Sequence, residues 1–323
     1  MPLYPEIRTI LDAIAAGGGY ELGTGTVLQD REAMAQLGGA TQQEPVALHR
    51  VRDLGIPGPA GPLAARGYWP SDAPDLPIVL FWHGGGWQMG DIDSVDRPVR
   101  AIAERAGVIV ISASYRLAPE HPHPAAIEDG YAALQWVSAN AERLGGHPDH
   151  VIVAGESSGG NVAGAVALMA REAGGPPVAH QFLITPTVDA DLTRPSCLAY
   201  GEDHLLTTKM MHLVWRRYLG PELSADLDAE RYDRIPPRAA LLRHPDLAGL
   251  APATVVACEC DPHHDEDVAY AERLQEAGVP TRLADFPGLT HGALNLAGVV
   301  PQAREYADAL ADLVAEAADR RTA

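Results

Sequence analysis

Six short runs of apolar residues, separated by stretches of helical character, constrain the fold of this 323-residue chain most strongly. The runs cover residues 77–82, 107–113, 150–155, 180–185, 252–258 and 281–286. The helical stretches lie near residues 94–106, 124–140, 158–172, 265–277 and 301–318. Strands that are apolar throughout must be covered on both faces. The alternation therefore predicts an α/β fold, with a mostly parallel sheet between two layers of helices.

A hairpin precedes these runs. The segment "VALHRVRDL" (46–54) alternates polar and apolar residues, "GIPGPAG" (55–61) is rich in turn formers, and "LAARGYW" (63–69) reads as a second strand. Two such runs around a turn indicate a β-hairpin. With the hairpin, the predicted sheet has eight strands.

Two parts of the chain, residues 1–45 and 190–249, contain no buried strand and interrupt the alternation of strands and helices. Long insertions in compact domains commonly serve as lids, and ligands bind at the carboxyl edge of open α/β sheets. We therefore expect a helical cap over that edge. The predicted organisation is an N-terminal cap segment at 1–45, a catalytic domain at 46–189 and 250–323, and a cap insertion at 190–249.

The N-terminal segment contains an apolar stripe. Ile7, Ile10, Leu11 and Ile14 recur at the spacing of one helix face. We expect this stripe to pack over the site and help to line its pocket. The flexible "GGGYELGTGT" that follows is interpreted as a linker, because no buried strand precedes it and no lysine follows it, as a phosphate-binding loop would require.

The charge balance excludes several partners. Lys and Arg total 24 and Asp and Glu total 43, a formal net charge of −19, which argues against nucleic acid and anionic membranes. No run of 18 apolar residues is present, so no membrane span is expected. The N-terminus lacks a basic region followed by an apolar one, so the expected location is cytoplasmic.

The most informative motif is "GESSGG", which joins the apolar run at 150–155 to an alanine-rich helical stretch. It contains the pattern G-x-S-x-G between a strand and a helix. In that context the serine sits on a sharp turn and presents its hydroxyl at the head of the helix. The motif predicts Ser157 as a nucleophile.

A nucleophilic serine needs a base and an acid. In this architecture they follow the serine in the order acid, then histidine, each after a strand. Asp261 follows the run 252–258 and His291 follows 281–286, so both are predicted at the same sheet edge as Ser157. Two alternatives are less favoured by the sequence: a base from "HPHP" (121–124) and a metal site in "DPHHDED" (261–267).

The segment "HGGGW" (83–87) follows the strand predicted at 77–82. Acyl transfer places negative charge on the substrate oxygen, and backbone N–H groups must point at it. We expect the donors to be the N–H groups of Gly84, Gly85 and Ser158. His83 is expected to support the loop by hydrogen bonding, not to act on substrate.

These motifs together resemble those of the bacterial hormone-sensitive-lipase-like esterases, family IV of the α/β-hydrolase superfamily. The matching phrases are "HGGG" (83–86), "YRLAPEHPHPAAIEDGYAAL" (115–134), "GESSGG" (155–160), "DPHHDE" (261–266) and "HGA" (291–293). The resemblance spans roughly residues 45–318. It implies the α/β-hydrolase fold, a serine carboxylesterase without cofactor or metal, a small-molecule ester as substrate, and often a homodimer.

Several positions depart from the family pattern. Glu156 and Ser158 replace the usual Asp and Ala of the elbow, and Ala293 replaces the usual Phe. We expect Glu156 to support the elbow loop, and Trp87 and Ala293 to contribute to the substrate pocket. The loss of a ring at Ala293 predicts room for a bulkier ester than most relatives accept.

The sequence therefore predicts a serine hydrolase that cleaves carboxylic esters, with short or medium acyl groups or a bulkier specialised group, through an acyl-enzyme. The alternatives kept open are an acyltransferase, an amidase or a biosynthetic cyclase with the same triad. A non-catalytic ligand-binding protein is a further alternative, which the presence of all three triad residues disfavours.

Overall fold

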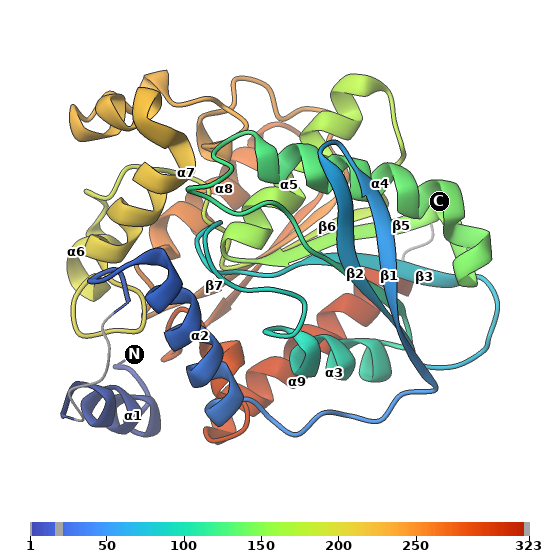
Figure 1. Cartoon of the computed structure of the whole chain (residues 1–323), viewed down its shortest axis with the longest axis horizontal. Coiled ribbons are helices and arrows are strands. Elements are labelled where there is room, and N and C mark those ends of the chain that lie inside the picture. Colours follow the sequence, from blue (N-terminus) through green and yellow to red (C-terminus); the bar gives the residue numbers. More distant parts are fainter. Residues whose placement is uncertain (1, 17–21, 320–323) are drawn as a thin grey trace.

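The computed structural model describes residues 2–16 and 22–319 (Figure 1). Eight strands form one sheet in the order β1-β2-β4-β3-β5-β6-β7-β8. β2 is antiparallel to β1 and β4, and the remaining pairs are parallel. The bounds are β1 (Arg50–Gly58), β2 (Gly61–Trp69), β3 (Leu76–Trp82), β4 (Ile109–Ala113), β5 (Gly146–Glu156), β6 (His180–Ile184), β7 (Ala253–Cys258) and β8 (Thr281–Phe286). The predicted eight-stranded, mostly parallel α/β-hydrolase sheet is confirmed.

Helices cover both faces of the sheet, as the apolar strands require (Figure 1). One face carries α3 (Asp96–Ala106) and α9 (Pro301–Asp319), which pack against each other. The other face carries α4 (Ala125–Leu144), α5 (Ser158–Ala173) and α8 (His264–Glu276). Each of these five helices agrees with a predicted stretch to within a few residues.

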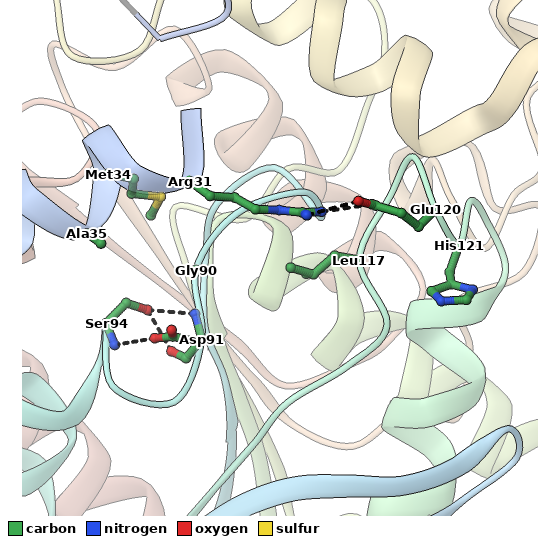
Figure 2. A pocket seen from close by; sticks show the side chains of 9 residues that line it. All are labelled: Arg31, Met34, Ala35, Gly90, Asp91, Ser94, Leu117, Glu120 and His121. Atoms are coloured by element: carbon green, nitrogen blue, oxygen red, sulfur yellow. Dashed lines mark hydrogen bonds and ion pairs between the residues drawn. The ribbon is translucent and has the colours of Figure 1, made fainter. Parts of the chain in front are cut away.

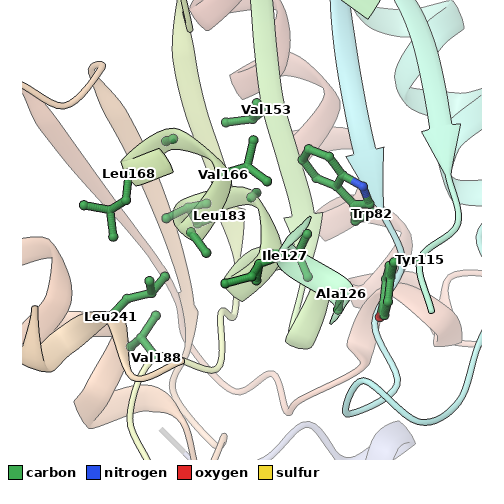
Figure 3. Close-up of a cluster of buried hydrophobic side chains, with 14 of the residues drawn as sticks. Trp82, Tyr115, Ala126, Ile127, Val153, Val166, Leu168, Leu183, Val188 and Leu241 are labelled. Atoms are coloured by element: carbon green, nitrogen blue, oxygen red, sulfur yellow. The ribbon is translucent and has the colours of Figure 1, made fainter. Parts of the chain in front are cut away.

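Successive residues of the central strands feed two separate cores. In β3, Ile78, Leu80 and Trp82 belong to the core under α4 and α5, whereas Val79 and Phe81 belong to the core under α3 and α9. Figure 3 shows part of the first core, which contains Trp82 together with side chains from α4, α5 and β6. This period of two is the physical reason why the runs are apolar at every position.

The hairpin forms, but its boundaries differ from the prediction. β1 continues through the segment "GIPG", and the turn is confined to the two residues between Gly58 and Gly61. Ile56 is fully buried and pairs with Leu63, so burial extends the strand past its turn-forming residues. Pro57 is tolerated because β1 is an edge strand.

The two segments outside the sheet are helical. The N-terminal segment forms α1 (Pro5–Ala16) and α2 (Val27–Thr41), and residues 190–249 form α6 (Pro195–Tyr200), α7 (Thr208–Asp228) and two short 3-10 turns. α7 is broken at Gly220, where φ is 75° and Pro221 follows. Figure 1 shows α1, α2, α6 and α7 gathered at one side of the sheet. Part of the predicted linker, residues 17–21, lies outside the described residues.

The apolar stripe of α1 is only partly buried. Ile7 and Leu11 are buried in the same core as α9, Ile10 is half-buried, and Ile14 is 37% exposed. Tyr4 donates its N–H to the carbonyl of Gly288 at 3.0 Å, which ties the helix to the chain just before His291. Across the two described ranges, no helix is long and apolar enough to cross a membrane.

Candidate active site

The turn between β5 and α5 holds Ser157 in a strained backbone conformation, with φ 56° and ψ −120°. Non-glycine residues rarely adopt positive φ, and such strain collects at functional sites. The surrounding glycines allow the turn. A Cβ atom on Gly159 would lie 2.1 Å from the carbonyl oxygen of Trp82, so no side chain fits there. The N–H of Ser157 donates to the carbonyl of Ile184 at 2.8 Å and fixes the turn against β6.

Three predicted residues from three separate strand ends meet at this turn. Nε2 of His291 lies 3.0 Å from Oγ of Ser157, and Nδ1 of His291 lies 2.7 Å from Oδ2 of Asp261. Asp261 is fully buried, and Ser157 is 8% exposed. With Nδ1 protonated, His291 donates to Asp261 and leaves Nε2 free to accept the serine proton.

The electrostatics fit this proton arrangement. Burial opposes the ionisation of Asp261, but the charge and the hydrogen bond of His291 outweigh it, so the pKa of Asp261 lies below its ordinary value. Burial likewise favours neutral His291, but Asp261 outweighs burial and holds the pKa of His291 above its ordinary value. Asp261 is therefore a carboxylate that stabilises the imidazolium.

His263 is a neighbour that the sequence analysis did not assign to the site. Its N–H donates to Oδ1 of Asp261 at 2.8 Å, and its ring meets the ring of His291 edge-on, with centroids 4.8 Å apart. Burial, and then the proximity of His291, lower the pKa of His263 to about 4. A neutral ring therefore packs beside the catalytic pair. Only its position two residues after Asp261 hinted at this contact.

A metal ion is the alternative use of these side chains. One donor atom each of Asp261, His263 and His291 lie within 4.8 Å of one another. Asp261 and His291 already bond to each other, and the second nitrogen of His291 faces Ser157. The contacts of Asp261 and His291 are thus those of a proton-transfer pair, and His263 packs beside it.

The glycine-rich loop after β3 lies directly against the nucleophile. A Cβ atom on Gly84 would stand 3.4 Å from Cβ of Ser157. Gly85 has φ +117°, and a Cβ there would lie 2.4 Å from the carbonyl oxygen of Met89. Ser158 opens α5, and the N–H groups of a first helical turn have no partner within the helix. Gly84 and Ser158 therefore lie beside Ser157, and Gly85 continues the same loop.

His83 holds this loop from within. Its Nδ1 lies 2.8 Å from the carbonyl of Gly84, and its ring stacks on Tyr115 with centroids 4.4 Å apart. The hydroxyl of Tyr115 donates to the carbonyl of His83 at 2.9 Å. Burial lowers the pKa of His83, so the ring is neutral.

The remaining predicted residues are buried around the site. Trp87 is fully buried, and its ring stacks on Tyr218 of α7 with centroids 3.9 Å apart. Ala293 is 1% exposed and belongs to the core that contains Ile7. Glu156 is buried beside the elbow, and burial raises the pKa of its carboxyl. Trp87 therefore packs against α7, and its predicted place in the substrate pocket stays a prediction.

A cavity of about 440 Å³ lies between α2 and the loops that follow β3 and β4 (Figure 2). In Figure 2, Arg31 reaches from α2 across the cavity to Glu120, with contacts of 2.8 and 2.9 Å. Its lining consists of Arg31, Met34, Ala35, Gly90, Asp91, Ser94, Leu117, Glu120 and His121. The lining does not include Ser157, Asp261 or His291, so we assign this cavity no part in the chemistry.

A serine elbow between a parallel strand and a helix, followed in the chain by an acid and a histidine, is the arrangement of the α/β hydrolases. The family model described as the alpha/beta hydrolase fold matches residues 79–295, and the chain belongs to this family. The predicted resemblance to hormone-sensitive-lipase-like esterases is confirmed.

Several curated relatives are named esterases or carboxylesterases. Esterase LipI of Mycobacterium tuberculosis is 42% identical over 79% of this chain and 78% of its own length. Carboxylesterase NlhH of the same organism is 42% identical over 75% of each chain. The solved structure of a hyperthermophilic esterase from the archaeon Pyrobaculum calidifontis superposes with a TM-score of 0.88 at 34% identity, covering 98% of this chain and 99% of that one. The chain is therefore a carboxylesterase-type hydrolase that acts on small-molecule esters.

Proposed function

We propose that Ser157 is the nucleophile of this carboxylesterase and that His291 and Asp261 activate it. Nε2 of His291 takes the hydroxyl proton as Oγ attacks the ester carbonyl, and the tetrahedral intermediate forms. His291 then returns the proton to the departing alcohol, leaving an acyl-enzyme. Water repeats the sequence and releases the acid. The observation that carries this proposal is the unbroken chain of contacts, 3.0 and 2.7 Å, from Ser157 through His291 to Asp261.

The oxyanion of each intermediate is bound by the N–H groups of Gly84, Gly85 and Ser158. Such donors stabilise charge only where they are held in advance, because they then need no reorganisation during the reaction. The bond of His83 to the carbonyl of Gly84, and its stack on Tyr115, support a bracing role for His83.

The substrate is a small ester with a short or medium acyl group, or a bulkier specialised group. Ser157 is only 8% exposed, which favours a ligand that enters between elements over a polymer that lies on the surface. The segments 1–45 and 190–249 serve as the cap that shapes this entry. Trp87 and Ala293 contribute to the substrate pocket in this proposal, as the sequence predicts.

Matched serine variants test the proposal. Ser157→Ala should reduce ester turnover by several orders of magnitude, leaving only the contribution of binding and the oxyanion hole, about 10³–10⁴ over water. Ser158→Ala should retain activity, because it keeps the backbone N–H. Turnover of p-nitrophenyl esters of graded acyl length measures both activity and chain preference. Loss of activity in Ser158→Ala with turnover retained in Ser157→Ala would contradict the assignment.

A further inference from the structure

A buried polar bridge connects the cap to the loop that carries the proposed oxyanion donors. Nη1 of Arg217, in α7, lies 3.0 Å from Oδ2 of Asp30, in α2, and 2.8 Å from Oε1 of Gln88. The side chains of Asp30 and Gln88 are fully buried. We call Asp30, Arg217 and Gln88 the cap latch. It joins both cap segments to a loop of the catalytic domain.

The same face of α7 also contacts Gly86 and Trp87, the two loop residues before Gln88. Arg217 and Tyr218 lie three and four residues after Val214, a spacing that places all three on one side of the helix. A Cβ atom on Gly86 would lie 2.7 Å from a methyl group of Val214, and Trp87 stacks on Tyr218. Three consecutive loop residues are thus held by one helix face.

The N-terminal cap helix holds the loop from a second direction. Arg31 follows Asp30 in α2, and its Nε donates to the backbone carbonyl of Gln88 at 2.7 Å. Its Nη2 donates to the carbonyl of Ala118 at 3.2 Å. Gln88 is therefore bonded through its side chain to α7 and through its backbone to α2.

The loop is built so that the position of Gln88 affects Gly85. The N–H groups of Gln88 and Met89 both donate to the carbonyl of Gly85, at 3.2 and 3.0 Å. The turn that they close spans Gly85 to Met89. A displacement of Gln88 would therefore act on Gly85 through its bond to that carbonyl.

A buried ion pair is a weak source of stability, because the desolvation of both charges offsets their attraction. An apolar cap interface would serve stability at least as well. What the polar bridge adds is direction, because a charge-assisted hydrogen bond forms only within a narrow range of distance and angle between Arg217 and Gln88.

We propose that the cap latch positions the oxyanion donors, so that docking of the cap is required for the chemical step as well as for substrate binding. Gln88, Arg217 and Asp30 are then positioning residues that act through Gly84 and Gly85. This inference rests on the proposed roles of Ser157 and of those two glycines.

The test compares Gln88→Met with Gln88→Glu. Methionine removes the acceptor at nearly equal volume, whereas glutamate keeps an oxygen for Arg217. Arg238→Met is the matched control, because Arg238 bonds Glu172 of α5 and does not contact the loop. The concentration of active sites in each variant is titrated with a fluorophosphonate, and kcat and KM are then measured. The inhibition constant of a trifluoromethyl ketone is measured as well, because the oxygen of its adduct with the serine occupies the oxyanion site.

Loss of a whole oxyanion donor costs about 10²–10³ in kcat, so a loosened loop should cost about tenfold in Gln88→Met. KM should stay within about twofold, and the inhibition constant of the ketone should rise by the same factor as kcat falls. Gln88→Glu and Arg238→Met should keep native kcat. If Gln88→Met does not fold, Gln88→Leu is measured in its place.

Several results would overturn the inference. The first is a native kcat in Gln88→Met. The second is a loss of kcat in Gln88→Glu as large as in Gln88→Met. The third is a raised KM in Gln88→Met with an unchanged kcat. Failure of the wild-type enzyme to be titrated at Ser157 would instead overturn the proposed function, so the two failures are distinguishable.

Discussion

Asp261 uses its two oxygens for two purposes. Oδ1 accepts the N–H of His263 and Oδ2 accepts Nδ1–H of His291. The first bond fixes the carboxylate, and the second fixes the ring and its tautomer. Because both bonds favour the ionised carboxylate, they oppose the cost of its burial. The carboxylate of Asp261 is thus held in place by the backbone of His263, two residues further along the turn that follows β7.

Asp261→Asn should lower kcat by about 10⁴, because an amide can hold His291 in the wrong tautomer. Asp265→Asn is the matched control. Asp265 accepts the N–H of Ser196 in the cap, a bond that asparagine can also accept. Steady-state kinetics on one p-nitrophenyl ester decides between them. Near-native turnover in Asp261→Asn, with loss in Asp265→Asn, would move the acid to Asp265.

The pH dependence follows from the raised pKa of His291. The base must be neutral to accept the serine proton, so activity is lost as pH falls through this pKa. The pKa lies above the ordinary value of 6.5, and the acid limb of kcat/KM should therefore lie above pH 6.5. Profiles between about pH 5 and pH 9 measure it. A limb below pH 6.5 in the wild-type enzyme would refute the assigned interaction with Asp261.

The meeting of Ser157, Asp261 and His291 was predictable from sequence because each follows an apolar strand, and parallel strands place their ends at one edge. The surroundings were not predictable in this way. Trp87 packs against Tyr218, some 130 residues away, and no local pattern encodes that pairing. The placement of Ala293 in a core with Ile7 depends likewise on how α1 docks.

At the scale of elements, α1 is attached mainly by one end of its apolar stripe. Ile7→Ala should destabilise the protein by about 2–5 kcal/mol, because Ile7 is fully buried and its removal leaves a cavity. Ile14→Ala should change stability little, since Ile14 is 37% exposed. Urea unfolding of both variants provides the measurement. Equal effects would show that α1 does not dock as described.

The parallel strands and the five covering helices were predictable because their signal is local and periodic. The end of β1 was predicted too early because glycine and proline signal a turn, while the buried side chain of Ile56 carries the strand on to Gly58. The contacts of α7 with the glycine-rich loop were not predictable. Arg217 of α7 bonds Asp30, which lies 187 residues away in the chain.

At the scale of the whole molecule, the structure consists of one sheet with its covering helices and of further helices, α1, α2, α6 and α7, gathered at one side of it. The sheet brings three strand ends together, and helices from two separate parts of the chain lie over the loop that faces Ser157. The alternation of strands and helices in the sequence predicts that the strand ends meet at one edge. The position of the further helices over the loop can be seen only in the tertiary structure. A homodimer and a cytoplasmic location remain predictions from the sequence.

The most direct test of the account is to map the covalent adduct that a fluorophosphonate forms with the wild-type enzyme. The reagent phosphonylates an activated serine, and mass spectrometry of the digested protein locates the modified residue. The account predicts one adduct per chain, on Ser157, with loss of esterase activity in proportion to labelling. An adduct on Ser158 or any other residue, or full inhibition without modification of Ser157, would contradict it.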